Sequence, residues 1–323
     1  MYYIGIDLGG TNIAAGVVDD DHNIIKKISA PTGASRPADE ITADIAALCK
    51  RAAAEAGLTI GEIEYIGIAT PGSAKCDTGE ILYANNLPFS NYNMAEKLSA
   101  MLGEEKKVYI ENDANAAAKA EAVAGAAKGS KYSVMITLGT GVGGGIILDG
   151  QVYTGFNYAG AELGHIVIKK GGRRCSCGRF GCWETYSSAT GLVRTTREKL
   201  EECHKSGRKT VMDEMTGGDL QKVSARTAFN AMRRGDEVAA EVVDEYVDDL
   251  VCGLVNIINI FQPNVLSIGG GISGEGDYLL NMLPERVFAE TYSRGDTPQC
   301  TLKIAELGND AGIIGAAFLG RAI

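Results

Sequence analysis

Two stretches of the chain share one form: a strand-like run, Leu-Gly, a turn of small residues, and a second strand-like run. They read IDLGGTNIAAG from Ile6 and ITLGTGVGGGI from Ile136. The triplet Asn-Asp-Ala also opens a predicted helix twice, at Asn112 and at Asn309. Each echo alone is only a few residues long. Because both occur in the same order, we predict two related α/β halves that face each other across a cleft.

The hydrophobic periodicity supports an α/β fold. Strand-like runs such as YYIGID, IEYIGIA, KVYIE and NVLSIG alternate with amphipathic helical stretches, for example Pro37 to Gly57 and Met94 to Leu102. A length of 323 residues exceeds that of one typical domain. We expect a smaller lobe of residues 1–111 plus 308–323, and a larger lobe of residues 112–307.

Charge and composition exclude several classes of protein. The net charge is −10, with no dense basic stretch, which argues against a nucleic-acid partner. No apolar run reaches the roughly 18 residues of a membrane span. The chain starts with the strand-like MYYIGID, without the features of a signal peptide, and three of its eight cysteines crowd together. These features predict a cytoplasmic protein without a membrane partner.

The first glycine turn, DLGGTN, stands between two predicted strands. Glycine lacks a Cβ, so backbone N–H groups in such a turn can reach phosphate oxygens. Thr11 adds a hydroxyl donor, and Asp7 can hold Mg²⁺ through water. An ordinary hairpin turn is the alternative. The predicted nucleotide residues here are Asp7, Gly9, Gly10, Thr11 and Asn12.

Two further glycine runs follow predicted strands. The second, GTGVGG, matches G-x-G-x-x-G, but a strand follows it, whereas a dinucleotide site needs a helix there. The third lies in SIGGGIS, where bare backbone leaves room for an adenine ring or ribose; a plain turn is the alternative. Together the three turns predict an ATP site. The residues assigned to it from these two runs are Gly139, Thr140, Gly141, Gly143, Gly269, Gly270 and Gly271.

One histidine and three clustered cysteines predict a metal site. His165 precedes CSCGRFGCWE, which contains Cys175, Cys177 and Cys182. These four side chains make a complete tetrahedral set for Zn²⁺, with no open position, so the metal is expected to be structural. Chance proximity and a disulfide pair are the alternatives, and a reducing compartment disfavours the second.

Two carboxylates flank the predicted zinc site. Glu162 lies three residues before His165, and Glu184 lies two residues after Cys182. A bound metal would fix both carboxylates relative to each other. Vicinal sugar hydroxyls are donors that such carboxylates accept, so this loop is predicted to bind a sugar.

Asp113 stands where the strand in YIENDANAAA gives way to a helix. A helix-capping residue is one interpretation. The other is a general base, because phosphoryl transfer needs a carboxylate to orient and deprotonate the attacking hydroxyl. The neighbouring Asn112 has an amide that can both donate to and accept from a hydroxyl.

Together these motifs resemble the ROK family (repressors, open reading frames and kinases), from Ile4 to Leu319. The most specific element is E-x-G-H…C-x-C-G-x-x-G-C-x-E, here Glu162 to Glu184, and the DLGGT, TPG, END, GTGVGGG and GGG elements occur in the family's order. The resemblance implies the two-lobed fold of hexokinase, actin and Hsp70. It also implies an ATP- and Mg²⁺-dependent kinase acting on the 6-hydroxyl of a hexose.

The resemblance assigns individual roles. Asp113 matches the family's catalytic base. Members with this signature are mostly glucokinases; others phosphorylate fructose, mannose, allose or N-acetylmannosamine, and members are commonly homodimers or homotetramers. Many glucokinases have glycine at the position of Ala161, a small departure here. The residues that match the family's sugar contacts are Gly72, Asn86, Asn112, Asp113, Glu162, His165 and Glu184.

Two other classes remain as alternatives. The family contains transcriptional repressors, which carry a helix-turn-helix module before the first phosphate turn. Here Asp7 lies close to the start, and the acidic charge opposes DNA binding. An actin-like ATPase without a sugar substrate would leave the cysteine cluster and Glu184 unexplained.

Overall fold

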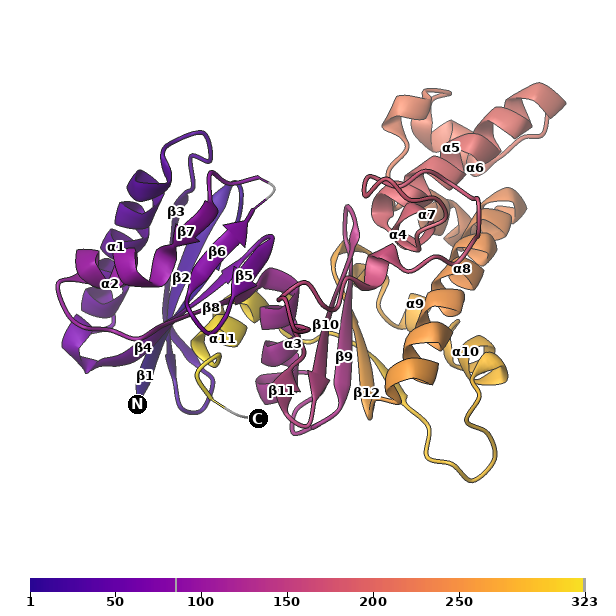
Figure 1. The fold of residues 1–323 in the computed structure, drawn as a ribbon. Helices are drawn as coiled ribbons and strands as arrows, with labels where there is room; N and C mark the ends of the chain where they lie inside the picture. Colours follow the sequence, from indigo (N-terminus) through magenta and orange to yellow (C-terminus); the bar gives the residue numbers. More distant parts are fainter. Residues whose placement is uncertain (85, 322–323) are drawn as a thin grey trace. The chain divides into compact units, whose positions relative to one another are not determined.

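The computed structural model describes residues 1–84 and 86–321 and contains two five-stranded sheets (Figure 1). The strand order is β3-β2-β1-β4-β8 in the first sheet and β11-β10-β9-β12-β13 in the second. The same order therefore occurs twice along the chain, which is the duplication that the sequence echoes predicted.

The first sheet begins with a meander and ends with two parallel strands. It consists of β1 (Tyr2–Leu8), β2 (Asn12–Asp19), β3 (Ile24–Pro31), β4 (Ile63–Thr70) and β8 (Val108–Asn112). β1 pairs antiparallel with β2 and parallel with β4, and β4 pairs parallel with β8. Parallel pairing brings the carboxyl ends of β1, β4 and β8 to one edge of the sheet.

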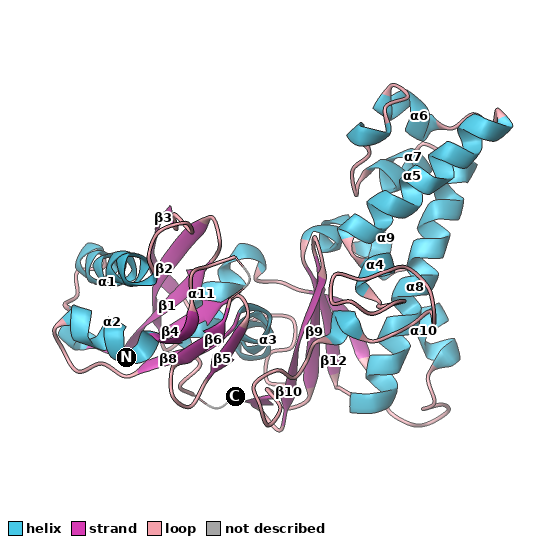
Figure 2. Cartoon of the chain, turned by 45° about the horizontal axis from the view of Figure 1, so that its top comes forward, coloured by secondary structure: helices cyan, strands magenta, loops and turns pink. Residues whose placement is uncertain are grey.

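Helices cover both faces of this sheet (Figure 2). Because side chains alternate along a strand, Ile4, Ile6 and Leu8 pack against α1 (Ala38–Glu55) and α2 (Met94–Leu102). Tyr3 packs with α3 (Asp113–Ala124) and α11 (Ala311–Ala317) on the other face.

Glycines let α11 lie directly on the sheet. A Cβ at Gly5 would overlap the carbonyl oxygen of Ile313, and one at Gly67 would overlap that of Ala316. The helix therefore approaches β1 and β4 at backbone distance.

A small antiparallel sheet, which the periodicity did not predict, precedes α2. Its strands are β5 (Ser73–Lys75), β6 (Glu80–Tyr83) and β7 (Ser90–Asn93), in the order β5-β6-β7. β5 contacts β8, so this sheet lies beside the strand that leads to Asp113.

The second sheet repeats the plan with β9 (Ser133–Leu138), β10 (Val142–Leu148), β11 (Gln151–Val152), β12 (Val265–Gly269) and β13 (Thr301–Ile304). β10 pairs antiparallel with β11, and β12 pairs parallel with β13. The glycines from 143 to 145, predicted to belong to a turn, lie within β10.

Most of the helical residues after β11 belong to seven helices among the described residues. α8 spans 25 residues and buries one side along most of its length. Short 3₁₀ turns occur at Ile60–Glu62, Leu163–His165, Leu220–Lys222, Gly271–Glu275 and Gly308–Asp310. The seven helices are α4 (Glu184–Ser187), α5 (Ala189–Ser206), α6 (Val211–Thr216), α7 (Thr227–Arg233), α8 (Glu237–Phe261), α9 (Asp277–Leu280) and α10 (Pro284–Glu290).

The chain forms two compact units. Unit 1 contains Met1–Met135, Gly145–Ala161 and Ala305–Ile323, and unit 2 contains Ile136–Gly144 and Glu162–Ile304. α3 groups with unit 1 by its contacts, whereas the lobe boundaries at 111/112 and 307/308 stay a prediction. No helix within 1–84 or 86–321 is long and apolar enough to cross a membrane.

Candidate active site

The first glycine turn joins β1 to β2 in unit 1. Gly9 N donates to Asn12 O at 3.0 Å and closes the turn. Thr32, which follows β3 and is fully buried, fixes the turn: its Oγ1 donates to Gly9 O at 2.6 Å and its N–H to Thr11 O at 2.8 Å. Residues Gly10, Thr11 and Asn12 are exposed at the tip. The loop is thus fixed from behind and presents its tip to solvent.

Asp7 lies just before this turn, against α11. A Cβ at Gly312 would come within 2.7 Å of the Asp7 carboxyl carbon, so a side chain there would force the Asp7 carboxylate to shift. Burial raises the pKa of Asp7, and the Lys27 ammonium opposes that shift. A cation beside Asp7 would favour its charged form in the same way.

Asn112, not Asp113, is the N-cap residue of α3. Its Oδ1 accepts from Ala114 N at 2.9 Å and from Asn115 N at 3.3 Å. Asp113 is the exposed first residue of the helix, and its Oδ1 accepts from Ala114 N at 2.8 Å. The structure therefore gives the capping role to the neighbour of the predicted base.

Unit 1 also contains Gly72 and Asn86, two further residues predicted to contact the sugar. Asn112 Nδ2 donates to Gly72 O at 2.9 Å. Gly72 has φ +91°, and a Cβ there would overlap the carbonyl oxygen of Tyr83, so both its conformation and its space require glycine. Asn86 lies beside the first glycine turn, since a Cβ at Gly10 would be 3.5 Å from the Asn86 Cβ.

The second glycine turn lies in unit 2, between β9 and β10. Gly139 N donates to Gly141 O at 3.0 Å, and Gly139 O accepts from Ala189 N at 2.8 Å. Thr190 Oγ1 donates to Thr140 O at 2.8 Å. The first residues of α5 therefore fix this turn by hydrogen bonds to its backbone carbonyls.

The third glycine run is adjacent to the second. Gly270 has φ +84°, and a Cβ there would lie 2.6 Å from the backbone nitrogen of Leu138, the residue before Gly139. Gly269 ends β12, and Gly271 opens a 3₁₀ turn. The two predicted nucleotide segments of unit 2 thus meet at backbone distance.

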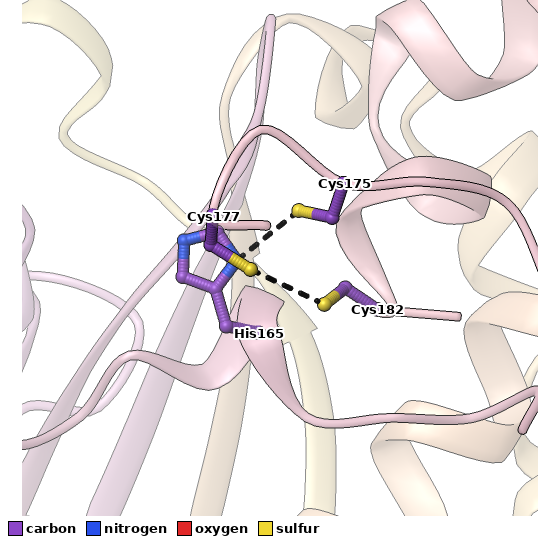
Figure 3. A group of neighbouring side chains, drawn as sticks. All are labelled: His165, Cys175, Cys177 and Cys182. Atoms are coloured by element: carbon purple, nitrogen blue, oxygen red, sulfur yellow. Dashed lines mark hydrogen bonds between the residues drawn. The ribbon is translucent and has the colours of Figure 1, made fainter. Parts of the chain in front are cut away.

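The four predicted metal ligands gather in one place (Figure 3). The ligand atoms of His165, Cys175, Cys177 and Cys182 all lie within 4.8 Å of one another. Cys175 Sγ is 3.6 Å from His165 Nδ1, and Cys177 Sγ is 3.6 Å from Cys182 Sγ, far longer than a disulfide bond. Three thiols and one imidazole at these separations fit a tetrahedral metal site.

Glycine conformations and a buried tryptophan shape this loop. Gly178 has φ +89°, Gly181 has φ +81°, and a Cβ at Gly181 would overlap the carbonyl oxygen of Lys169. Trp183 is fully buried; its Nε1 donates to Asp249 O at 3.0 Å, and its ring packs on Gly253 of α8. The cluster is therefore attached to the longest helix.

Glu184 connects the cysteine cluster with the second glycine turn. Its Oε2 accepts from Val142 N at 3.1 Å, and its Oε1 is 3.8 Å from Cys175 Sγ. A Cβ at position 141 would overlap Glu184 Oε2, so a side chain there would displace the Glu184 carboxylate. Glu162 is exposed, and its carbonyl accepts from His165 N at 3.1 Å at the start of the turn that holds His165.

One polar residue of this region belongs to the END element but received no predicted role. Glu111 precedes Asn112 and is only 5% exposed, with its carboxylate bonded to the residues around the start of α3. A charged residue at the end of a buried strand, immediately before Asn-Asp, was the available signal.

Comparison with known proteins places the chain in a family. The ROK family profile matches residues 3–323, so the chain belongs to the ROK family, as its motifs predicted. The glucokinase of Thermotoga maritima is 36% identical over 98% of this chain and 96% of its own length. The N-acetyl-D-glucosamine kinase of Salmonella gallinarum is 32% identical over 99% of each chain.

A solved relative confirms the fold class. The structure of a ROK family glucokinase from Streptomyces griseus, in complex with glucose and AMPPNP, matches with a TM-score of 0.77 and 33% identity over 99% of both chains. The predicted α/β architecture of two actin-like lobes is therefore correct.

Proposed function

We propose that this protein transfers the γ-phosphate of ATP to the 6-hydroxyl of a hexose, with glucose as the substrate and glucose 6-phosphate as the product. The geometric observation that carries the proposal is the hydrogen bond from Val142 N to Glu184. It joins a carboxylate assigned to the sugar to a turn assigned to nucleotide phosphates, within one unit. The similarity to glucokinases over nearly the whole chain supports the same activity.

In this proposal Asp113 is the general base. As the 6-hydroxyl oxygen attacks the γ-phosphorus, Asp113 accepts the hydroxyl proton, and ADP leaves with the electrons of the broken P–O bond. Asn112 caps α3 and presents its amide beside Asp113. Mg²⁺ with ATP supplies charge neutralisation at the phosphates, and Asp7 is the residue that would hold it through water. The proposed sugar contacts are Gly72, Asn86, Asn112, Asp113, Glu162, His165 and Glu184.

The glycine turns bind the nucleotide in this proposal. Backbone N–H groups of Asp7–Asn12 and of Gly139–Gly143 bind the phosphates in this proposal. They suit this role because they are hydrogen-bond donors whose dipoles are held in a fixed direction toward the anion. The run Gly269–Gly271 leaves bare backbone for the adenosine. The support is the close packing of Gly270 on the strand end that leads into Gly139.

The metal site is proposed to hold structural Zn²⁺. His165, Cys175, Cys177 and Cys182 supply four ligands and leave no open position for a substrate, so the ion would fix the loop that carries Glu184. Zn–S bonds of about 2.3 Å require only small shifts from the present separations of the sulfur atoms.

The test of the base is Asp113→Asn. We expect kcat to fall by about 10²–10⁴-fold, while calorimetric glucose binding stays close to wild type, because the amide keeps the shape but accepts no proton. Asp149→Asn, which alters an exposed carboxylate in the turn after β10, serves as the control and should leave kcat unchanged. Near-normal kcat in Asp113→Asn would remove Asp113 from the mechanism.

A second candidate substrate is an N-acetylhexosamine, which the 32% identity to an N-acetyl-D-glucosamine kinase favours. A coupled assay of ADP release over glucose, fructose, mannose, allose, N-acetylmannosamine and N-acetylglucosamine decides between the sugars. The highest kcat/KM should belong to glucose. ADP release that does not depend on any sugar would contradict a hexose kinase.

We further propose that the protein acts in the cytoplasm as a homodimer or homotetramer. Unpaired thiols are kept reduced in that compartment, and all eight cysteines are unpaired. Sedimentation velocity measures the state of assembly, and a monomer at micromolar concentration would contradict this part of the proposal.

A further inference from the structure

Glu111 is a buried carboxylate that the proposed mechanism leaves without a role. It is the second-last residue of β8, immediately before Asn112, and is 5% exposed. Burying a carboxylate is costly unless donors surround it. Burial raises the pKa of Glu111, and hydrogen bonds from Cys76, Asn115 and Asn112 oppose that shift.

Three donors converge on this carboxylate. Oε1 accepts from Asn112 N at 2.9 Å and from Asn115 Nδ2 at 3.0 Å. Oε2 accepts from Cys76 Sγ at 2.9 Å. Cys76 follows β5, Asn112 ends β8, and Asn115 lies in the first turn of α3. One side chain therefore ties together three elements of unit 1.

Asp113 lies within the segment that these bonds fix. Asn112 and Asn115 stand on either side of it, and both donate to the same oxygen of Glu111. Asn115 Oδ1 finds no hydrogen-bond partner among the residues that the structure describes, so the bond to Glu111 is what orients this amide. Because donors on both sides of Asp113 are bonded to one acceptor oxygen, the backbone of Asp113 has little freedom to rotate.

We propose that Glu111 is a positioning residue for the kinase reaction: its two oxygens hold the junction between β8 and α3 so that Asp113 faces the sugar hydroxyl. The inference rests on the proposed role of Asp113. Glu111 is buried beneath the junction and bonded to protein groups, and it acts through Asn112 and Asp113. Small errors in the position of a catalytic group lower the rate steeply, about 10²-fold for 1 Å.

The geometry separates two ways in which Glu111 can act. Glu111→Gln keeps an acceptor oxygen at the position of Oε1 but removes the charge. Glu111→Asp keeps the charge but draws the oxygens back by one methylene, away from Asn112 and Asn115. If position is what matters, the Gln variant is the more active of the two; if charge is what matters, the Asp variant is.

The same helix offers a matched control for lost stability. Glu121 is also buried, 1% exposed, and accepts from Ala126 N at 2.7 Å, Glu306 N at 3.0 Å and Leu307 N at 2.9 Å. It stands two turns further along α3 than Asp113. Glu121→Gln therefore removes a comparable buried charge without touching the junction.

The experiment measures single-turnover phosphoryl transfer, KM for ATP and melting temperature for Glu111→Gln, Glu111→Asp, Glu121→Gln and Asp113→Asn. We expect the transfer rate to fall about 10–100-fold in Glu111→Asp and less than about 5-fold in Glu111→Gln, in keeping with the steep distance dependence of positioned groups. KM for ATP should stay near wild type in both. Glu121→Gln should lose melting temperature but keep its transfer rate.

Several results would overturn the inference. One is a Glu111→Asp variant as fast as wild type, and another is a Gln variant no faster than the Asp variant. A third is a transfer rate that falls in proportion to the loss of melting temperature, to the same extent in the Glu111 and Glu121 variants. A slow Asp113→Asn with a normal Glu111→Asp refutes only the positioning role, whereas a normal Asp113→Asn refutes the proposed base itself.

Discussion

Ala161 adopts a backbone conformation that side chains disfavour. Its φ is +63°, in the left-handed region, immediately before Glu162. Many glucokinases of the family have glycine at this position, and the positive φ is the physical reason. The chain keeps the conformation despite a cost of about 1–2 kcal/mol for a residue with a Cβ. The backbone that leads into Glu162 therefore passes through this left-handed conformation.

Ala161→Gly should relieve this strain. We expect the free energy of unfolding in urea to rise by up to about 1 kcal/mol, because the relief exceeds the extra entropy of glycine in the unfolded chain. The matched control is Ala47→Gly on the exposed side of α1, where the same change should cost about 1 kcal/mol. Equal losses in both variants would contradict the strain at position 161.

The sequence predicted which residues surround Asp113 but not the structural role of each one. The triplet Asn-Asp-Ala fits a cap at either polar residue, because both side chains accept backbone N–H groups. Only the structure shows Asn112 capping α3 and Glu111 bonded beneath it. One of the three donors to Glu111 is Cys76, 35 residues away in the sequence, a contact that no local pattern encodes.

At the scale of elements, the sequence predicted long periodic segments well and short strands poorly. The helix Met94–Leu102 lies where its periodicity placed it, and the buried strands β1, β4 and β12 follow their apolar runs. Strands β5 to β7 have three or four residues each and form through cross-strand pairing, which a local pattern does not reveal. Glycine in β10 serves packing, since a Cβ at Gly144 would overlap Leu163.

The loop that carries the proposed zinc ligands is an element whose order should depend on the proposed ion. Trp183 is the only tryptophan in the chain, follows Cys182 directly and is fully buried. Removing Zn²⁺ with a chelator should shift its emission to longer wavelength, because four thiol and imidazole groups without a metal no longer hold the loop against α8. Adding Zn²⁺ back should restore the spectrum.

Two variants make this test specific. Cys175→Ala should show the shifted emission before any chelator is added. Cys203→Ala, which removes a buried thiol of α5 outside the cluster, should respond to the chelator as wild type does. If the protein loses one equivalent of zinc and its emission spectrum does not change, the order of the loop does not depend on the metal.

For the whole molecule, the repeated strand order is the feature that the sequence predicted best. Two glycine turns with the same flanking pattern were enough to indicate two related halves, and the sheets have the same order. The extent of each unit was harder to predict, because unit 1 combines three separate stretches of chain. Their association depends on contacts such as Tyr3 with Ala317 and Phe318, which join opposite ends of the sequence.

This assembly predicts that unit 1 needs the last stretch of the chain to fold. Without residues 305–323, the face of the first sheet that carries Tyr3 and Tyr65 loses α11, and the buried carboxylate of Glu121 loses its bonds to Glu306 and Leu307. The truncation leaves a buried carboxylate with fewer donors and exposes several large apolar side chains. Together these changes should cost more than about 5 kcal/mol, which matches or exceeds the free energy of unfolding of many marginally stable domains.

A chain that ends at Ile304 is therefore expected to exchange the amides of β1 and β4 rapidly with deuterium, while the full chain protects them. As a control, a protease site inserted in the exposed stretch 294–299 and then cleaved should leave the protection intact, because the C-terminal stretch stays bound through its buried face. Adding a peptide of residues 305–321 to the truncated chain should restore protection in β1. Full protection in the truncated chain alone would show that the other two stretches of unit 1 fold without α11. The glycines at positions 5 and 67 would then have a purpose other than the close packing of this helix.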